Sequence, residues 1–291
     1  MKKYIFILSA LMLMLLSCKP KSELNKVVTV SILPYKYFTE RIVGDRFDVV
    51  CMLSKGGSPE AYEPSMANMM SLEKSDAYLM VGDLGFETAI KSKIKDFNPD
   101  IYIVDTSEGV TKIKGHHHHL DGDHADHECD VEFDPHVWTS VANVRTIVKN
   151  IYETVCTLDP QGEKVYKENY VKFDAELAAL QTIIAAELVD SKDKSFVVWH
   201  PSLSYFAQDY GLEQISVEFD NKENPTRYMQ NIVDVVKAED AKVFFIQPEM
   251  DPSKASAFNA HLQLQVVGVN PLSYDWEGEL LKVADAIARY K

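Results

Sequence analysis

Short apolar runs, separated by longer amphipathic stretches, recur along most of the chain. The runs are rich in Val, Ile, Phe and Tyr and end in Gly, Pro, Asn or Asp, as buried strands do. Helical patterns lie between most of them, including one with Asn224 as N-cap and Pro225 at the first helical position. This alternation predicts parallel sheets covered by helices. The predicted strands span residues 27–33, 47–53, 77–82, 101–105, 196–200, 214–219, 242–247 and 265–270.

These strands form two groups of four, separated by a long interval without a strand pattern. Within it, the apolar residues of 163–189 recur in steps of three and four, on one face of a helix without Gly or Pro. At about 1.5 Å per residue, such a helix would span about 40 Å. We therefore expect an α/β protein of two lobes, each with a four-stranded, mainly parallel sheet flanked by helices. The lobes would comprise residues 27–162 and 191–291, joined by one helix over 163–190. A single doubly wound domain with a long crossover helix is the alternative.

The first residues have the composition of an export signal. Two lysines precede an apolar run from Tyr4 to Leu16, which is shorter than the ~20 residues of a membrane-spanning helix. The sequence LLSC at residues 15–18, which overlaps the end of this run, resembles a lipobox. We therefore expect residues 1–17 to be a signal peptide, Cys18 to be lipid-modified, and residues 18–26 to be a polar tether. The protein would then be extracytoplasmic and bound to a membrane only through its lipid. The alternative is a plain signal peptide with an incidental cysteine.

Charge and histidine content narrow the class of ligand. The formal charge of −14 argues against nucleic acid, because phosphates require a basic surface. Seven of the nine histidines lie between Gly115 and Trp138, and clustered His, Asp and Cys suit zinc or copper. The low-complexity segment 115–130 is expected to be a mobile loop with secondary metal ligands. These are His116, His117, His118, His119, His124 and His127, and the sequence leaves the role of Cys129 among them open.

Four other metal-capable residues follow predicted strands or precede a predicted helix. His200 ends the run FVVWH, Asn270 ends VVGVN, Glu60 follows FDVVCML after a turn, and His136 stands in DPHVW before a helical pattern. Ligands of open parallel α/β sheets bind beyond the carboxyl ends of the strands. Each residue also has a purely structural reading, such as a turn former for Asn270 or a solvated carboxylate for Glu60. Because four coincide at one predicted surface, we expect a metal site in the cleft between the lobes.

The same residues carry a resemblance to a known family. DPHVW is similar to the D-P-H-x-W motif, and WHPSLSYFAQDYGL to the H-x-x-x-x-Y-F-x-x-x-Y-G-L motif, of the metal-binding receptors of ABC transporters. This group includes the ZnuA-type zinc receptors and the TroA-type manganese/zinc receptors. The resemblance covers nearly the whole mature chain and implies that His136 and His200 bind metal. It also implies that the long helix joins two lobes and that the His-rich loop is typical of members that prefer zinc.

Two positions depart from the pattern of that family. GGSPEAYEPS resembles G-x-x-P-H-x-x-E-P but has Glu60 at the histidine position, and VNPLS resembles D-P-L-G but has Asn270 at the aspartate position. Glutamate still supplies an anionic oxygen, whereas an amide oxygen is a poorer ligand. Two imidazoles, one carboxylate and water form a normal zinc environment. Such a site also accepts manganese or ferrous iron more readily than a three-histidine site does.

The resemblance implies a receptor that captures zinc outside the cytoplasm and delivers it to the permease of an ABC transporter, without catalysis and as a monomer. A manganese or iron receptor of the same fold is the nearest alternative. A zinc-dependent hydrolase would use a similar ligand set, but the chain has no H-E-x-x-H or other hydrolytic motif. A surface adhesin with a structural metal is the third alternative.

Overall fold

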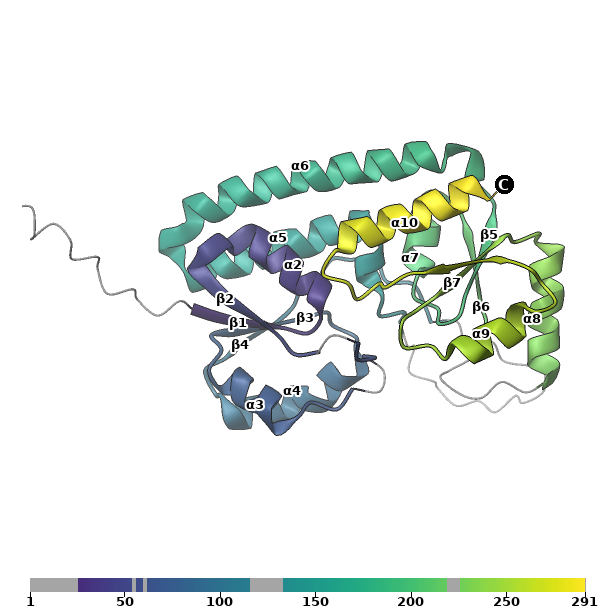
Figure 1. The fold of residues 1–291 in the computed structure, drawn as a ribbon. Coiled ribbons are helices and arrows are strands. Elements are labelled where there is room, and N and C mark those ends of the chain that lie inside the picture. Colours follow the sequence, from purple (N-terminus) through teal and green to yellow (C-terminus); the bar gives the residue numbers. More distant parts are fainter. Residues whose placement is uncertain (1–25, 54–55, 60–61, 116–132, 219–225, 291) are drawn as a thin grey trace, which may run out of the picture.

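The structure is a computed structural model that describes residues 26–53, 56–59, 62–115, 133–218 and 226–290 (Figure 1). It contains two α/β lobes, each built on a four-stranded parallel sheet. The predicted fold class is therefore confirmed. Within the described residues, no helix is both long and apolar enough to cross a membrane.

The N-terminal lobe has the strand order β2-β1-β3-β4, and every neighbouring pair is parallel. Its strands β1 to β4 span Lys26–Val30, Phe47–Cys51, Ala77–Met80 and Tyr102–Asp105. Its helices are α2 (Leu33–Val43), α3 (Met66–Glu73), α4 (Gly85–Phe97) and α5 (Val141–Leu158).

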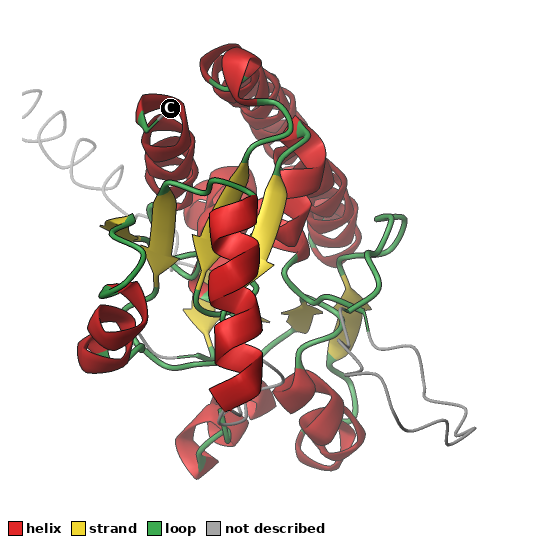
Figure 2. Cartoon of the chain, turned by 90° about the vertical axis from the view of Figure 1, so that its right-hand side faces the viewer, coloured by secondary structure: helices red, strands yellow, loops and turns green. Residues whose placement is uncertain are grey.

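The C-terminal lobe repeats this arrangement, with the parallel order β6-β5-β7-β8. Figure 2 shows helices on both sides of its strands. Strands β5 to β8 span Ser195–Val198, Glu213–Ser216, Val243–Ile246 and Gln265–Gly268. The helices are α7 (Ser204–Tyr210), α8 (Thr226–Ala238), α9 (Pro252–Asn259) and α10 (Trp276–Arg289). The predicted cap of α8, Asn224 with Pro225, lies outside the described residues.

Helix α6 (Glu163–Glu187) runs along both lobes in Figure 1 and is the long connecting helix that the apolar period predicts. It packs against α2 and α5 of the N-terminal lobe and against α10 of the C-terminal lobe. The buried face holds Tyr166, Phe173, Leu177, Leu180 and Ile184, all at positions of the predicted period. The helix ends before the 3-10 turn Val189–Ser191 that leads into the second lobe.

One hydrophobic core extends from the first lobe through α6 into the second. In strand β5, Phe196 and Val198 belong to this core, whereas Val197 between them faces a separate cluster beneath α8 and α9. At the junction, the ring of Trp276 meets that of Phe38 edge to face, with centroids 5.0 Å apart. A shared apolar interface of this kind favours small movements of the lobes over a wide hinge.

The Glu87 side chain is fully buried, and its carboxyl group connects the ends of two strands. It accepts hydrogen bonds from the backbone N–H groups of Val81 (2.7 Å) and Gly82 (2.8 Å), just beyond β3, and from the Ser31 hydroxyl, just beyond β1. Burial raises the pKa of Glu87 from 4.5 to about 7, although these hydrogen bonds lower it. The native state therefore holds the Glu87 proton more tightly than the unfolded chain does.

This raised pKa predicts a loss of stability with rising pH. The contribution of Glu87 is complete below pH 4.5 and disappears as pH rises to about 7. At about 1.4 kcal/mol per pKa unit, about 3 kcal/mol of unfolding free energy is lost over this window. Urea unfolding of wild type and Glu87→Gln at pH 5 and pH 8 measures it. The isosteric variant does not titrate, so its difference between the two pH values should be smaller than that of wild type. Equal differences would contradict the assignment.

Candidate metal centre

In the C-terminal lobe, each strand delivers one polar side chain just past its carboxyl end. His200 follows β5, Glu218 follows β6, Gln247 follows β7 and Asn270 follows β8. Backbone pairing continues beyond the strand ends, since Trp199 N–H donates to Phe245 (3.1 Å) and Glu218 N–H donates to Trp199 (2.9 Å). In parallel sheets this edge is where ligands bind.

His136 comes from the N-terminal lobe and is held by its own local sequence. The backbone N–H (2.9 Å) and ring Nδ1 (2.8 Å) of His136 both lie within hydrogen-bond distance of Asp134 Oδ1. The Asp134 side chain thereby stabilises a turn at Asp134-Pro135. The carbonyl oxygen of His136 accepts from the backbone N–H (3.0 Å) and the hydroxyl (2.9 Å) of Thr139. Ser140 then caps α5 by accepting from Asn143 N–H. The histidine is therefore fixed on both sides, and only 5% of it is exposed.

His200 is held by the neighbouring strands of its own sheet. Its Nδ1 lies 2.9 Å from Glu218 Oε2. The Gln247 amide brackets the His200 backbone, donating to its carbonyl oxygen (3.3 Å) and accepting from its N–H (3.4 Å), and also donates to the Ser202 hydroxyl (2.7 Å). The imidazole is therefore attached to β6 through Glu218, and the His200 backbone is attached to β7 through Gln247.

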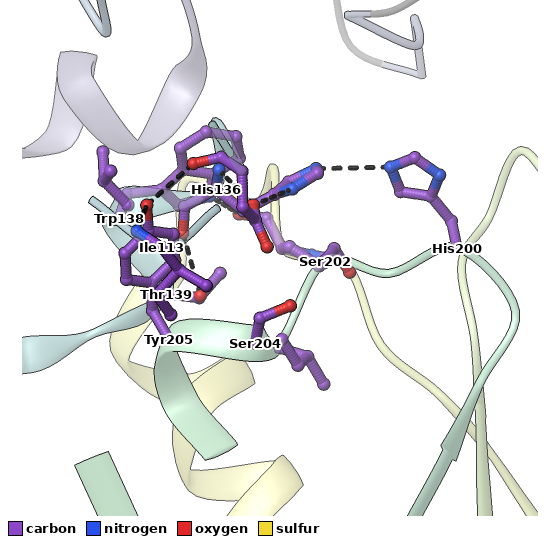
Figure 3. Close-up of polar contacts among 12 residues, drawn as sticks. Ile113, His136, Trp138, Thr139, His200, Ser202, Ser204 and Tyr205 are labelled. Atoms are coloured by element: carbon purple, nitrogen blue, oxygen red, sulfur yellow. Dashed lines mark hydrogen bonds and ion pairs between the residues drawn. The ribbon is translucent and has the colours of Figure 1, made fainter. Parts of the chain in front are cut away.

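The two imidazoles face each other between the lobes (Figure 3), with Nε2 atoms 3.3 Å apart and ring planes inclined by 71°. Each Nδ1 contacts a carboxylate, which accepts a hydrogen bond from Nδ1–H, so the proton stays on Nδ1 and the lone pair is on Nε2. Two nitrogens bound to a tetrahedral zinc ion at about 2.0–2.1 Å lie about 3.3–3.4 Å apart. The spacing of His136 and His200 therefore suits two ligands of one zinc ion.

Beside the two imidazoles, the Asp134 side chain is a hydrogen-bond acceptor that remains negatively charged. Its pKa is lowered below the ordinary value: burial opposes the shift, and the interactions with His136 and with the Ser204 hydroxyl outweigh burial. A carboxylate that stays ionised keeps the His136 proton on Nδ1. Asp134 thus orients the imidazole of His136, with Nε2 left open toward His200.

Hydrogen bonds between the two lobes also hold the chain around His136 in place. Trp138 donates from Nε1 to the carbonyl oxygen of Pro271 (2.9 Å), and Trp276 donates from Nε1 to that of Trp138 (2.8 Å). The Tyr205 hydroxyl of α7 donates to the carbonyl oxygen of Asp134 (2.8 Å) and accepts from Ile113 N–H (3.1 Å). The position of His136 therefore depends partly on the C-terminal lobe.

Tyr205→Phe tests this contact. The variant leaves the carbonyl oxygen of Asp134 and the N–H of Ile113 without the hydroxyl, which costs about 1–3 kcal/mol of unfolding free energy. Tyr210→Phe in the same helix is the matched control, because the buried Tyr210 hydroxyl has no hydrogen-bond partner among the described residues. Urea unfolding should show the loss for Tyr205 alone; equal stability of the two variants would contradict a bridging role.

The structure brings His136 and His200 together, as expected. The Asn270 amide oxygen accepts from Leu272 N–H (3.0 Å) and so forms a turn, which matches the structural alternative for this residue. Within the described residues, no group of three or more His, Cys, Asp and Glu side chains is arranged to hold one metal ion. Several predicted residues lie outside the described part of the chain: Cys18, Glu60, His116, His117, His118, His119, His124, His127 and Cys129.

Glu218 and Gln247 were not predicted. Glu218 lies inside the run QISVEF and reads as the polar position of an alternating strand, and Gln247 is the last residue of KVFFIQ. The rule that selected His200 and Asn270, a polar residue at the carboxyl end of a strand, applies to both in the structure. The strand predicted over 214–219 places Glu218 before its carboxyl end, and Gln247 is a neutral amide, so neither residue stands out as a metal ligand in the sequence.

Two parallel α/β lobes, one connecting helix and a pair of facing imidazoles between them define a class of two-lobed solute-binding proteins. Residues 28–288 match the family described as zinc-uptake complex component A, periplasmic, and the chain belongs to this family. The resemblance seen in the sequence motifs is therefore confirmed.

Named relatives agree with this membership. The chain is 28% identical to the zinc-binding protein AdcA of Streptococcus pyogenes serotype M3, over 88% of this chain and 52% of the relative. It is 25% identical to the zinc-binding lipoprotein AdcA of Streptococcus pneumoniae serotype 4, over 94% of this chain and 56% of the relative. The chain thus spans about half the length of these relatives. A crystal structure of ZnuA matches with a TM-score of 0.82 and 30% identity, covering 91% of this chain and 99% of that one.

Proposed function

We propose that the protein is an extracytoplasmic receptor that captures zinc and delivers it to the permease of an ABC transporter. The observation that carries this proposal is the 3.3 Å separation of the Nε2 atoms of His136 and His200, each with a carboxylate at Nδ1. Membership of the zinc-uptake family and the zinc-binding relatives support the same cargo.

In this proposal, His136 and His200 bind the ion directly, and Glu60 supplies an anionic third ligand. Asn270 or water would complete the shell. The histidines of the 115–130 segment form weaker, secondary sites. Manganese or ferrous iron is the alternative cargo, since a site with carboxylate oxygen accepts these ions.

Reversible capture requires no chemical step. The continuous core between the lobes favours release by a small displacement of one imidazole from the other, because an ion shared by two lobes is lost when the Nε2 atoms separate. The zinc hydrolase alternative would need a general base and a substrate site in addition.

We also propose that Cys18 carries a lipid that holds the receptor at a membrane, as a monomer. The pneumococcal relative is named a lipoprotein, which supports this anchor. Mass spectrometry of the exported protein measures it directly. An unmodified residue 18, or a mature chain that begins elsewhere, would overturn the anchor without affecting the metal site.

Metal exchange tests the function. Protein stripped of metal by a chelator is titrated with zinc and with manganese at pH 7.5, while circular dichroism follows the fold. A receptor binds one zinc ion tightly and further ions weakly, prefers zinc to manganese, and keeps its fold when stripped. Collapse on stripping would favour the adhesin with a structural metal. Preference for manganese would change the cargo, and turnover of test esters or peptides would favour the hydrolase.

A further inference from the structure

We propose that Glu218 is a positioning residue of the metal centre: it sets the tautomer of His200 and supplies the negative charge that Asn270 does not. This inference rests on the proposed function. It concerns the C-terminal half of the site, where the sequence departs from the family pattern, and it assigns a role to a residue that the metal-binding motifs do not contain.

The geometry separates Glu218 from the ion. Its Oε2 lies 2.9 Å from His200 Nδ1, on the side of the ring opposite to Nε2, and Nε2 is the atom that faces His136. One imidazole cannot present both nitrogens to the same ion. Glu218 therefore acts through His200, by keeping the proton on Nδ1 and by raising the electron density at Nε2.

Backbone hydrogen bonds between the ends of β5 and β6 determine that Glu218 lies next to His200. Val217 N–H donates to Val198 (2.9 Å) and Glu218 N–H donates to Trp199 (2.9 Å), which places Glu218 beside His200 in the extended register of β5 and β6. Both side chains are largely shielded from solvent, with 19% of His200 and 25% of Glu218 exposed. A hydrogen bond to a charged acceptor is stronger in such surroundings than in water.

Charge provides the second argument. A zinc ion brings two positive charges into a site whose C-terminal loop offers Asn270, a neutral side chain already engaged with Leu272 N–H. Asp134 stands behind one imidazole and Glu218 behind the other, so each histidine is backed by one carboxylate. These two carboxylates therefore add negative charge near the ion without touching it.

A series at this position separates the two effects. Glu218→Gln keeps an acceptor oxygen and loses the charge, whereas Glu218→Ala loses both. At one fixed pH, and in competition with a chelator of known affinity, Glu218→Ala should bind zinc about 10–100-fold more weakly than wild type. The zinc affinity of Glu218→Gln should lie between those of wild type and Glu218→Ala. Nitrogen-15 spectra of the metal-free protein should show His200 protonated at Nδ1 in wild type and in Glu218→Gln, and a mixture of tautomers in Glu218→Ala.

Glu213→Gln is the matched control, because Glu213 is an exposed residue at the other end of β6. Zinc affinity of Glu218→Ala within about threefold of wild type, or an unchanged tautomer of His200, would overturn the inference. If Glu218→Ala does not fold, the zinc affinity of the isosteric variant Glu218→Gln tests the inference instead. Loss of binding in His200→Ala with no effect in the Glu218 series refutes only this inference. No effect in either refutes the proposed function as well.

Discussion

Zinc binding is expected to fall at least about tenfold, a loss of about 1.4 kcal/mol, when either His136 or His200 is replaced by alanine. Each substitution removes one of the two Nε2 atoms that face each other at 3.3 Å. The remaining imidazole would keep its carboxylate but would lose the second nitrogen that closes the chelate between the lobes. Calorimetry or chelator competition with the stripped proteins measures the effect.

His261→Ala is the control for this prediction. His261 lies in the C-terminal lobe, is exposed, and precedes β8 rather than following it, at the opposite edge of the sheet from the site. Its removal should leave the tight site unchanged. Unaltered affinity in both His136→Ala and His200→Ala would remove the primary site from the boundary between the lobes.

Trp276→Ala is expected to lower the unfolding free energy by about 3–5 kcal/mol, the usual cost of deleting a buried aromatic ring. Only 2% of Trp276 is exposed. Its ring meets Phe38 edge to face, and its Nε1 donates to the carbonyl oxygen of Trp138, so the cavity would open where the two lobes join. Urea unfolding measures the loss.

Tyr290→Ala serves as the control for Trp276→Ala. Tyr290 directly follows the same helix and is 39% exposed, so its removal should cost much less. A similar loss in the two variants would mean that the junction at Trp276 does not hold the lobes together. A small loss in Trp276→Ala would mean the same.

The sequence predicted the strands well because each has a short apolar run, but it placed several carboxyl ends too late. The run predicted over 196–200 ends as a strand at Val198, and that over 265–270 ends at Gly268. Val269 is 4% exposed although it lies beyond β8. Its N–H still donates to Ile246 (2.9 Å), so burial and backbone hydrogen bonds extend past the last residue of the strand, and the apolar pattern extends with them.

The two histidines could be predicted because each lies in a motif and at the boundary of a predicted element, a strand end for His200 and a helix start for His136. The supporting residues could not be found in the same way. Glu218 has the polarity of an alternating strand, and Tyr205 has that of an amphipathic helix. The contacts of Trp138 and Trp276 depend on how the lobes dock, which no local period encodes. Local patterns thus predict elements and candidate ligands, whereas the contacts that orient these side chains arise from tertiary packing.

The most direct test of the metal centre is a crystal structure of the zinc-loaded protein with diffraction recorded at the zinc absorption edge. We predict an anomalous peak between the lobes, about 2.0–2.1 Å from the Nε2 atoms of both His136 and His200. Asp134 and Glu218 should remain at the Nδ1 atoms and outside the coordination shell. A fully occupied zinc ion elsewhere, with no peak between these two imidazoles, would contradict the assignment of the site.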